Sequence, residues 1–365
     1  MRKLLAINFL QYFIGSALAI ALPLLLLERG IDVATIGAIF AALPVVFLAA
    51  RTVFAAIADQ AGIRRFFLLN AAANAGMLVV YYLADSPPLY ALGKVMEGVK
   101  DSSFWAVVRT AAFSDARGME ARSAALLSGV RTLATALGTL GAGAAIALWS
   151  FEGTLLALLV LSLLLFPPSL LLKKDTGRWS LGEAARLVFR KRSAFFWKAS
   201  LAVSLYGLAA NALFVLPIFM KSELGLGYKE IGALFALYYL LGSAVTLLSV
   251  RARLPFGWAC AGAFLLFSPA AVLLWNPGLF LPLFALLALG DGLAAVVFEN
   301  VIARASVGNS SVSTDIAVMH APFRVMEFVA FIGAGWVAQH YGFAPVFAGA
   351  ALAFALFCTV ALKIR

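Results

Sequence analysis

The stretch LPLLLLERGIDVATIGAIFA, residues 22–41, recurs in altered form as LPIFMKSELGLGYKEIGALFA at residues 216–236. Both copies have Leu-Pro near the end of an apolar run, then an acidic residue, and then Ile-Gly-Ala at the start of the next run. The two copies are 194 to 195 residues apart, and Gly-Ala-Gly at residues 141–143 recurs at residues 333–335 with an offset of 192. Self-similarity at a nearly fixed offset indicates an internal duplication. The sequence therefore predicts a chain of two related halves.

The composition places both halves in a membrane. Hydrophobic residues make up 64% of the 365 residues, and charged residues make up 12%. Soluble proteins have about 45–50% and about 25%, respectively. So few charges cannot cover a soluble chain of this length. The composition predicts a helical membrane protein, and it excludes a soluble enzyme, a DNA-binding domain and a disordered tail.

Twelve apolar runs have about the length of 20 residues that a spanning helix needs. A polar linker, residues 173–194, separates six runs from six and is predicted to be a basic amphipathic helix on the cytoplasmic leaflet, with a plain linker as the alternative. We therefore predict an all-α polytopic membrane protein with two pseudo-symmetric six-helix bundles, residues 1–172 and 195–365. The predicted spans are Leu4–Leu27, Thr35–Ala58, Phe66–Ala84, Leu89–Phe113, Ala121–Ser150, Leu155–Leu172, Phe195–Met220, Glu230–Val250, Phe256–Leu274, Leu279–Ala303, Val312–Gln339 and Phe343–Ile364.

The positive charges predict how the chain is oriented. Lys and Arg residues, which give the chain a net charge of +11, gather at the termini and in the even-numbered connectors. The other connectors hold Arg29, Lys221 and Lys229. This asymmetry predicts that both termini are cytoplasmic, in a multi-pass protein of the cell membrane. Because the charges lie in short connectors and not along one solvated face, we expect no nucleic-acid partner.

The loop after the second span carries a recognisable pattern, AAIADQAGIRR at residues 55–65. Together with six spans, a cytoplasmic linker and six more spans, it resembles the major facilitator superfamily, whose loop pattern is Gly-x-Leu-Ala-Asp-Arg-x-Gly-Arg-Lys. Asp59, Gly62 and Arg64 fit this pattern, and two other positions depart from it. The resemblance implies a transporter that rocks two halves around a central site. It also implies that Asp59, Gly62 and Arg64 help to latch the halves in one conformation.

The fourth span carries charges that need an explanation, since one charge at the bilayer centre costs about 2.5–3.5 kcal/mol or more. At the helical repeat, five of its side chains share one face: Lys94, Glu97, Asp101, Trp105 and Arg109. This face is predicted to line a water-filled cavity or a partner helix. Trp105 there suits stacking on a ligand, although a core or gate residue is the commoner role.

Each half places one Asp and one Arg near the middle of equivalent spans, Asp101 and Arg131 in the first half and Asp291 and Arg324 in the second. Two interpretations remain open. The four residues form two ion pairs, Asp101–Arg131 and Asp291–Arg324, that pin helices together. Alternatively, Arg131 and Arg324 bind an anionic or polar substrate, because a guanidinium group holds carboxylate or phosphate through two hydrogen bonds.

Other polar side chains of the spans complete the predicted site. Carboxylates in apolar surroundings accept protons more readily, which suits them to proton coupling. No cofactor and no metal are expected, because no His-Glu-x-x-His or paired-Asp pattern is present. The predicted substrate-binding residues are Arg131, Arg324, Trp105, Tyr12, Gln11 and Asn211, and the predicted proton-coupling residues are Glu97, Asp101, Asp291, Glu327 and His320.

Together, the residues and the resemblance predict a secondary active transporter that is not an enzyme. We expect it to move a small organic solute, anionic solutes included, by alternating access coupled to protons. Its expected partners are that solute, protons and membrane lipid, and it is expected to be a monomer. The alternatives are a multidrug or amphiphile efflux transporter and a lipid flippase, followed by a non-transporting receptor or scaffold and an intramembrane enzyme.

Overall fold

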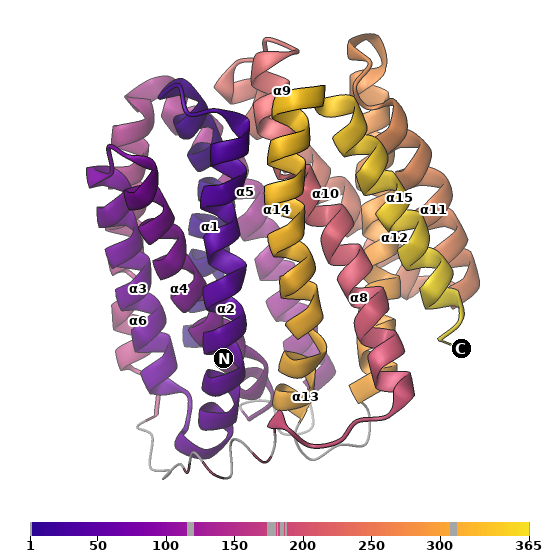
Figure 1. Cartoon of the computed structure of the whole chain (residues 1–365). Coiled ribbons are helices and arrows are strands. Elements are labelled where there is room, and N and C mark those ends of the chain that lie inside the picture. Colours follow the sequence, from indigo (N-terminus) through magenta and orange to yellow (C-terminus); the bar gives the residue numbers. More distant parts are fainter. Residues whose placement is uncertain are drawn as a thin grey trace. The chain divides into compact units, whose positions relative to one another are not determined.

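The computed structural model describes residues 2–114, 120–173, 180, 182, 186, 188–306 and 312–364. These residues are mostly helical and contain no β-strand (Figure 1). The helices up to residue 173 are α1 (Arg2–Glu28), α2 (Val33–Ala61), α3 (Arg64–Leu83), α4 (Pro87–Ser114), α5 (Glu120–Leu163) and α6 (Phe166–Leu170). Those from residue 188 onwards are α8 (Ala194–Ala212), η1 (Leu213–Val215), α9 (Leu216–Ser222), α10 (Tyr228–Arg251), α11 (Phe256–Leu273), η2 (Pro277–Leu279), α12 (Phe280–Ser306), α13 (Val312–Met319), α14 (Ala321–Tyr341) and α15 (Phe343–Leu362).

Ten segments within these described ranges are long and apolar enough to cross a membrane. One of them, Leu126–Leu170, holds two predicted spans, because Ser150 at φ 73° interrupts the helix between them. α4 is outside the ten since it carries the charged face predicted for the fourth span. The helical polytopic fold class is thus confirmed, and the ten segments are consistent with twelve spans. Most of the predicted amphipathic linker helix lies outside the described residues.

Two predicted spans are broken into shorter helices. The seventh predicted span is α8, η1 and α9, with Pro217 in the first turn of α9. The eleventh is α13 and α14, which meet at His320 and have Pro322 in the first turn of α14. Proline lacks the N–H that a helix interior needs, whereas the first turn of a helix leaves that N–H unpaired in any case. These prolines therefore mark where a new helix starts.

In each half, the second long helix begins within the duplicated stretch, and an acidic side chain there accepts hydrogen bonds at its first turn. At the start of α2, Asp32 accepts hydrogen bonds from the N–H of Thr35 at 2.9 Å and from its hydroxyl at 2.7 Å. At the start of α10, the Glu230 carboxylate accepts one from the N–H of Gly227 at 2.5 Å. Both arrangements satisfy N–H groups that the first turn of a helix leaves unpaired. The two halves thus begin their second long helix at the same place by different means.

Contacts divide the chain into two compact units. The first unit comprises Met1–Leu22, Ala42–Lys191 and Ser310–Val318, and the second comprises Pro23–Ala41, Arg192–Asn309 and Met319–Arg365. Within the first unit, α3 packs against α4, α5 and α6; within the second, α8 packs against α12, α14 and α15 (Figure 1). Each unit includes a short segment from the other half of the sequence. The predicted domain limits at residues 172 and 195 stay a prediction.

The segment 23–41 packs within the second unit through the glycine of its Ile-Gly-Ala motif. A Cβ added to Gly37 would lie 2.3 Å from the carbonyl oxygen of Phe331 on α14. Beside this contact the rings of Phe40, Phe214 and Phe331 meet, with centroids 5.2 to 5.7 Å apart. A small residue lets two helix backbones approach closely. The first copy of the motif thus serves helix packing.

The first unit holds α13 through a buried ion pair. Nη2 of Arg190 lies 2.9 Å from Oδ2 of Asp315, whose side chain is fully buried. Arg190 itself is more than one-third exposed. A buried carboxylate needs a positive charge beside it, because an uncompensated charge in a protein interior is costly. The pair therefore ties the end of the linker to α13.

The duplication extends to helix packing inside each half. Gly98 on α4 and Gly292 on α12 are 194 residues apart. A Cβ on Gly98 would lie 2.9 Å from the carbonyl oxygen of Leu43 on α2, and one on Gly292 would lie 2.3 Å from that of Gly242 on α10. In both halves, then, the fourth span touches the backbone of the second span at a glycine.

Candidate functional site

The charged face of α4 forms a buried network in the first unit. Nζ of Lys94 lies 2.9 Å from a carboxylate oxygen of Glu97, and that oxygen also accepts a hydrogen bond from the hydroxyl of Tyr81 at 3.0 Å. Nζ of Lys100 lies 3.2 Å from Asp101 and 4.0 Å from the other oxygen of Glu97. Lys100 is 1% exposed. Two ammonium groups and two carboxylates thus offset each other along one helix face.

Amide side chains connect this network to α1 and α3. Nε2 of Gln11 donates to Asp101 at 3.0 Å. Oε1 of Gln11 accepts hydrogen bonds from Asn70 at 3.0 Å and from Asn74 at 2.9 Å. Asn70 and Asn74 are one turn apart on α3 and fully buried. These contacts fix which end of the Gln11 amide faces the carboxylate, and so they position Asp101.

Beside the network lies a partly exposed surface that we call the Arg131 surface: Tyr12, Asp101, Trp105 and Arg131. The ring of Tyr12 meets that of Trp105 edge-on, with centroids 6.2 Å apart. The Arg131 guanidinium carbon is 5.8 Å from the centroid of the Tyr12 ring, within cation–π range. The Asp101 side chain is 24% exposed and lies one turn before Trp105 on α4. This surface offers aromatic faces, a guanidinium group and a carboxylate.

In the second unit, Asp291 on α12 has tyrosine neighbours. The hydroxyl of Tyr206 donates to Oδ1 of Asp291 at 2.8 Å, and Tyr238 makes a second hydrogen bond to the same carboxylate. Within the described residues no ion pair joins Asp291 to Arg324; Arg324 contacts the carboxylate of Glu327 on its own helix. The interpretation that Asp291 and Arg324 pair is therefore wrong. Asp291 accepts hydrogen bonds from tyrosine hydroxyls, and Arg324 pairs with Glu327.

The duplication also relates residues of the first unit's network to the residues around Asp291 in the second unit. The pairs separated by 194 residues are Tyr12 and Tyr206, Glu97 and Asp291, and Phe104 and Phe298. Each tyrosine packs against the phenylalanine of its half, with ring centroids 5.9 Å apart in the first unit and 4.9 Å apart in the second. Asp291 thus corresponds to Glu97, the residue one turn before Asp101.

The remaining predicted residues of the second unit fall in two places. Arg324, Glu327 and His320 lie together at the start of α14, where the His320 ring is 6.0 Å from that of Phe298. Asn211 instead donates to a main-chain carbonyl one turn back in α8, at 2.8 Å. The structure therefore brings His320 close to Phe298, which packs against Tyr206, whereas the Asn211 amide is used within its own helix.

The chain matches the model of a known protein family. The family model of the Major Facilitator Superfamily matches residues 4–304. The chain belongs to the major facilitator superfamily. Members of this family are secondary transporters of small molecules and not enzymes, so the ten apolar segments belong to a membrane transporter.

Solved transporter structures share the fold. The nucleoside transporter NupG is 14% identical, with a TM-score of 0.71, over 99% of this chain and 98% of its own. A bacterial homolog of the human lysosomal transporter Spinster, inward-facing and occupied, is 15% identical, with a TM-score of 0.74, over 99% and 94%. Its inward-facing, unoccupied form is 14% identical, with a TM-score of 0.69 and the same coverage. No curated protein sequence matches. At these identities the likeness shows the fold alone.

The predicted latch of the transporter is described in part. The side chain of Asp59 lies outside the described residues. Gly62 has φ 98°, a left-handed conformation that favours glycine, and Arg64 is the first residue of α3. A tight turn is thus present at Gly62, and the latch role of the three residues stays a prediction, as does every assignment of a transport role above.

Several residues of these networks were absent from the predicted site. Lys100 precedes Asp101 and lies three residues after Glu97, a spacing that pairs charges on a helix. Asn70 and Asn74 are amides one turn apart in an apolar span. Tyr206 could have been found by applying the offset of 194 residues to Tyr12. Tyr238 gave no signal, because its role depends on how α10 packs on α12.

The two cysteines and the acidic residues of the described ranges provide no metal centre. Cys260 and Cys358 are free, buried and adjacent, with Sγ of Cys260 donating to the carbonyl oxygen of Cys358 at 3.4 Å. No group of three or more His, Cys, Asp or Glu side chains in the described parts of the chain is placed to hold a metal ion.

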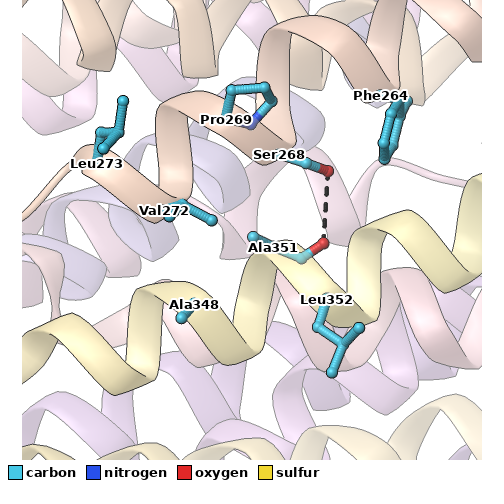
Figure 2. A pocket seen from close by; sticks show the side chains of 8 residues that line it. All are labelled: Phe264, Ser268, Pro269, Val272, Leu273, Ala348, Ala351 and Leu352. Atoms are coloured by element: carbon cyan, nitrogen blue, oxygen red, sulfur yellow. Dashed lines mark hydrogen bonds between the residues drawn. The ribbon is translucent and has the colours of Figure 1, made fainter.

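An apolar groove of about 520 Å³ lies between α11 and α15 in the second unit (Figure 2). Across it the hydroxyl of Ser268 donates to the carbonyl oxygen of Ala351 at 3.4 Å. The groove contains no charged side chain and none of the predicted site residues. Its lining is Phe264, Ser268, Pro269, Val272, Leu273, Ala348, Ala351 and Leu352.

Proposed function

We propose that this transporter moves a small organic solute across the cell membrane by alternating access, that it couples this movement to protons, and that the Arg131 surface contacts the solute. The observation that carries the proposal is the partly exposed Asp101 carboxylate. It lies on the Arg131 surface, accepts a hydrogen bond from the buried Gln11 and forms an ion pair with the buried Lys100. A carboxylate that is both accessible and supported by a buried cation can change its charge without unfolding its surroundings.

The Arg131 surface suits a solute with an anionic group and a flat part. The guanidinium of Arg131 stays charged and can bind a carboxylate or phosphate through two hydrogen bonds. The rings of Tyr12 and Trp105 give aromatic faces on which a planar group stacks. We therefore propose that an organic anion is bound here in the first unit.

Proton binding is coupled to solute binding because a proton on Asp101 changes the charge of the Arg131 surface. With Asp101 ionised, Lys100 at 3.2 Å is neutralised mainly by this carboxylate. A proton on Asp101 removes that negative charge. The Arg131 surface then becomes more positive, because the charges of Lys100 and Arg131 are less offset. Opposite charges attract more strongly at low dielectric than in water. Proton uptake thus favours binding of the anion, and Asp291, Glu327 and His320 are the further titratable groups proposed in the second unit.

The test is solute-driven proton movement in proteoliposomes that contain the whole chain and a trapped pH-sensitive dye. The solutes are small organic carboxylates, and nucleosides because one structural neighbour is described as a nucleoside transporter. We expect an imposed pH gradient to drive uptake, and we expect Asp101→Asn or Asp291→Asn to weaken it. Uptake that ignores the gradient in the unmodified protein would contradict proton coupling.

Substitutions of Arg131 separate solute binding from helix pinning. Arg131→Lys should weaken uptake sharply with folding intact, because a point charge replaces a two-pronged donor. If Arg131 serves as a pin, Arg131→Ala should lower the thermal unfolding temperature, and adding Asp101→Ala should restore much of it. Restored stability together with retained transport would refute the anion site.

A further inference from the structure

Asp291 differs from four other carboxylates of the helices in having no cation beside it among the described residues. Among the described residues, no Lys, Arg or His side chain lies within ion-pair distance of Asp291. Four other carboxylates of these helices each lie beside a cation, in the pairs Glu97–Lys94, Asp101–Lys100, Asp315–Arg190 and Glu327–Arg324. A charge within a bilayer is costly unless it is neutralised. Asp291 is therefore neutralised either by a proton or by a cation that its own chain, in the described ranges, does not supply.

The surroundings of Asp291 are aromatic. Tyr206 and Tyr238 donate hydrogen bonds to its carboxylate. Tyr239 lies beside them, its ring centroid 5.5 Å from that of Tyr238 and nearly perpendicular to it. All four side chains are partly exposed and not sealed in the core. We call these four residues the tyrosine cage.

Three helices that pack on α12, namely α8, α10 and α11, add no compensating charge near its middle. α8 contributes Tyr206 and has a single charged residue, Lys198, in its first turns. α10 contributes Tyr238 and Tyr239, and its charged residues, Lys229, Glu230 and Arg251, lie at its two ends. α11 contains no charged residue, and Cys260 is its titratable side chain. The groups that face Asp291 from these three helices are thus tyrosine hydroxyls and aromatic rings.

We propose that the tyrosine cage binds an organic ammonium ion. Such an ion neutralises the Asp291 carboxylate, while the tyrosine rings attract the cation through their negative faces, as aromatic cages do for alkylated amines. A metal cation would need several oxygen ligands, and the cage offers one carboxylate and hydroxyls that are already donating to it. The inference rests on the proposed function in one respect, namely that Asp291 takes up and releases a proton. The ammonium ion is a second ligand, distinct from the anion proposed for the Arg131 surface, and it exchanges with that proton.

The experiment measures the thermal unfolding temperature of the purified whole chain at pH 8. The probes are tetramethylammonium, choline and phenethylammonium chlorides, and the neutral control is 3,3-dimethyl-1-butanol, which has the shape of choline without its charge. A ligand that binds the folded state raises this temperature in a saturable way. We expect at least one ammonium probe, and not the neutral alcohol, to do so.

Variants then locate the site. Asp291→Asn keeps an acceptor for Tyr206 and loses the charge, so the affinity for the ammonium probe should fall by roughly tenfold or more. Glu299→Gln makes the same acid-to-amide change at an exposed position of α12 and should leave the affinity unchanged. Tyr238→Phe keeps the aromatic face and should retain most of the binding, whereas Tyr238→Leu should lose it. Lowering the pH should weaken binding, because a proton on Asp291 competes with the cation.

Two results would overturn the inference: no ammonium probe stabilises the protein more than the neutral alcohol does, or Asp291→Asn binds the probe as tightly as the unmodified protein. Either result leaves the proposed function standing, with Asp291 as a proton site. Conversely, ammonium binding that depends on Asp291 in a protein whose transport ignores a pH gradient would keep the site and refute proton coupling.

Discussion

Lys100 shows how one buried residue supports the charged face of α4. Its side chain is 1% exposed, and its ammonium group lies between the carboxylates of Asp101 and Glu97. Lys100→Met removes this cation and so breaks its contacts with the carboxylates of Asp101 and Glu97. Removing one partner of a buried ion pair costs about 3–5 kcal/mol. We expect a loss of that order in the free energy of unfolding, measured by denaturant titration in detergent micelles.

Two further variants test this explanation. Lys198→Met makes the same change at an exposed position of α8 and should alter the free energy of unfolding by less than about 0.5 kcal/mol. Lys100→Met combined with Asp101→Asn removes both charges and should recover much of the lost stability. If the double variant were no more stable than Lys100→Met alone, the ion pair would not be the cause.

Asp32 gives a prediction that depends on pH. Hydrogen bonds from the hydroxyl and the N–H of Thr35 hold the pKa of Asp32 below its ordinary 3.8. A carboxylate with a lowered folded-state pKa stabilises the protein above the unfolded-state pKa, and this stabilisation is lost as the pH falls through the folded value. Asp32→Ala should therefore cost about 0.5–2 kcal/mol at pH 7, as the loss of a helix cap does. The cost should shrink below pH 3.8, and unfolding titrations at pH 7 and pH 3 measure both values.

The sequence predicted which residues belong to the site better than it predicted which residues their side chains contact. The helical repeat placed Glu97, Asp101 and Trp105 on one face of α4, and the structure shows them there. Depth counting left open that Asp291 pairs with Arg324, and this interpretation is wrong, because equal depth on two helices does not make their side chains face each other. The hydrogen-bonding tyrosine from α10 depends on tertiary packing, which no local pattern encodes.

Gly292 is where two helices of the second half come closest. A Cβ added there would lie 2.3 Å from the carbonyl oxygen of Gly242, and Thr246 donates a hydrogen bond to the Gly292 carbonyl at 2.8 Å. The obstacle is backbone, so α10 and α12 must move apart to admit a methyl group. Gly292→Ala should therefore lower the free energy of unfolding by about 1–3 kcal/mol, as overpacking does.

Gly349 provides the matched control for this prediction. It lies inside α15, and a Cβ built there meets nothing within 4 Å. Gly349→Ala should be neutral or stabilising by up to about 1 kcal/mol, because alanine favours the helix. Equal effects of the two substitutions in the same unfolding assay would show that close helix approach is not what Gly292 provides.

At the level of helices, apolar run length predicted most elements and missed their interruptions. The predicted fifth span ends at Ser150, where the structure interrupts the long helix. The breaks at η1 and at His320 lie inside runs that stay apolar, so hydrophobicity gave no sign of them. Pro217 and Pro322 lie at these breaks, but proline is also tolerated inside membrane helices, as at Pro23 in α1. Composition alone therefore does not decide where a span is cut.

The whole chain shows what a duplication does and does not predict. The repeated motifs indicated two related halves, and the equivalent glycines and tyrosines confirm that equivalent positions do equivalent packing. The contacts nevertheless group residues 23–41 with the second unit and residues 310–318 with the first. Offsets in sequence relate positions within each half, but they carry no information about which segment leaves its own half to pack elsewhere.

The charge asymmetry of the connectors predicts the orientation of the whole molecule in the membrane. Positive charges gather in the termini and even-numbered connectors, and cytoplasmic connectors are the ones enriched in Lys and Arg. In a chain with Cys260→Ala and Cys358→Ala, two exposed sites report the two sides: Asp85→Cys, between α3 and α4, and Lys191→Cys, before α8. A membrane-impermeant maleimide added to intact cells should label Asp85→Cys. It should label Lys191→Cys after the membrane is permeabilised and not before. The reverse pattern would place both termini outside, and it would mean that the charge asymmetry does not set the orientation of this transporter.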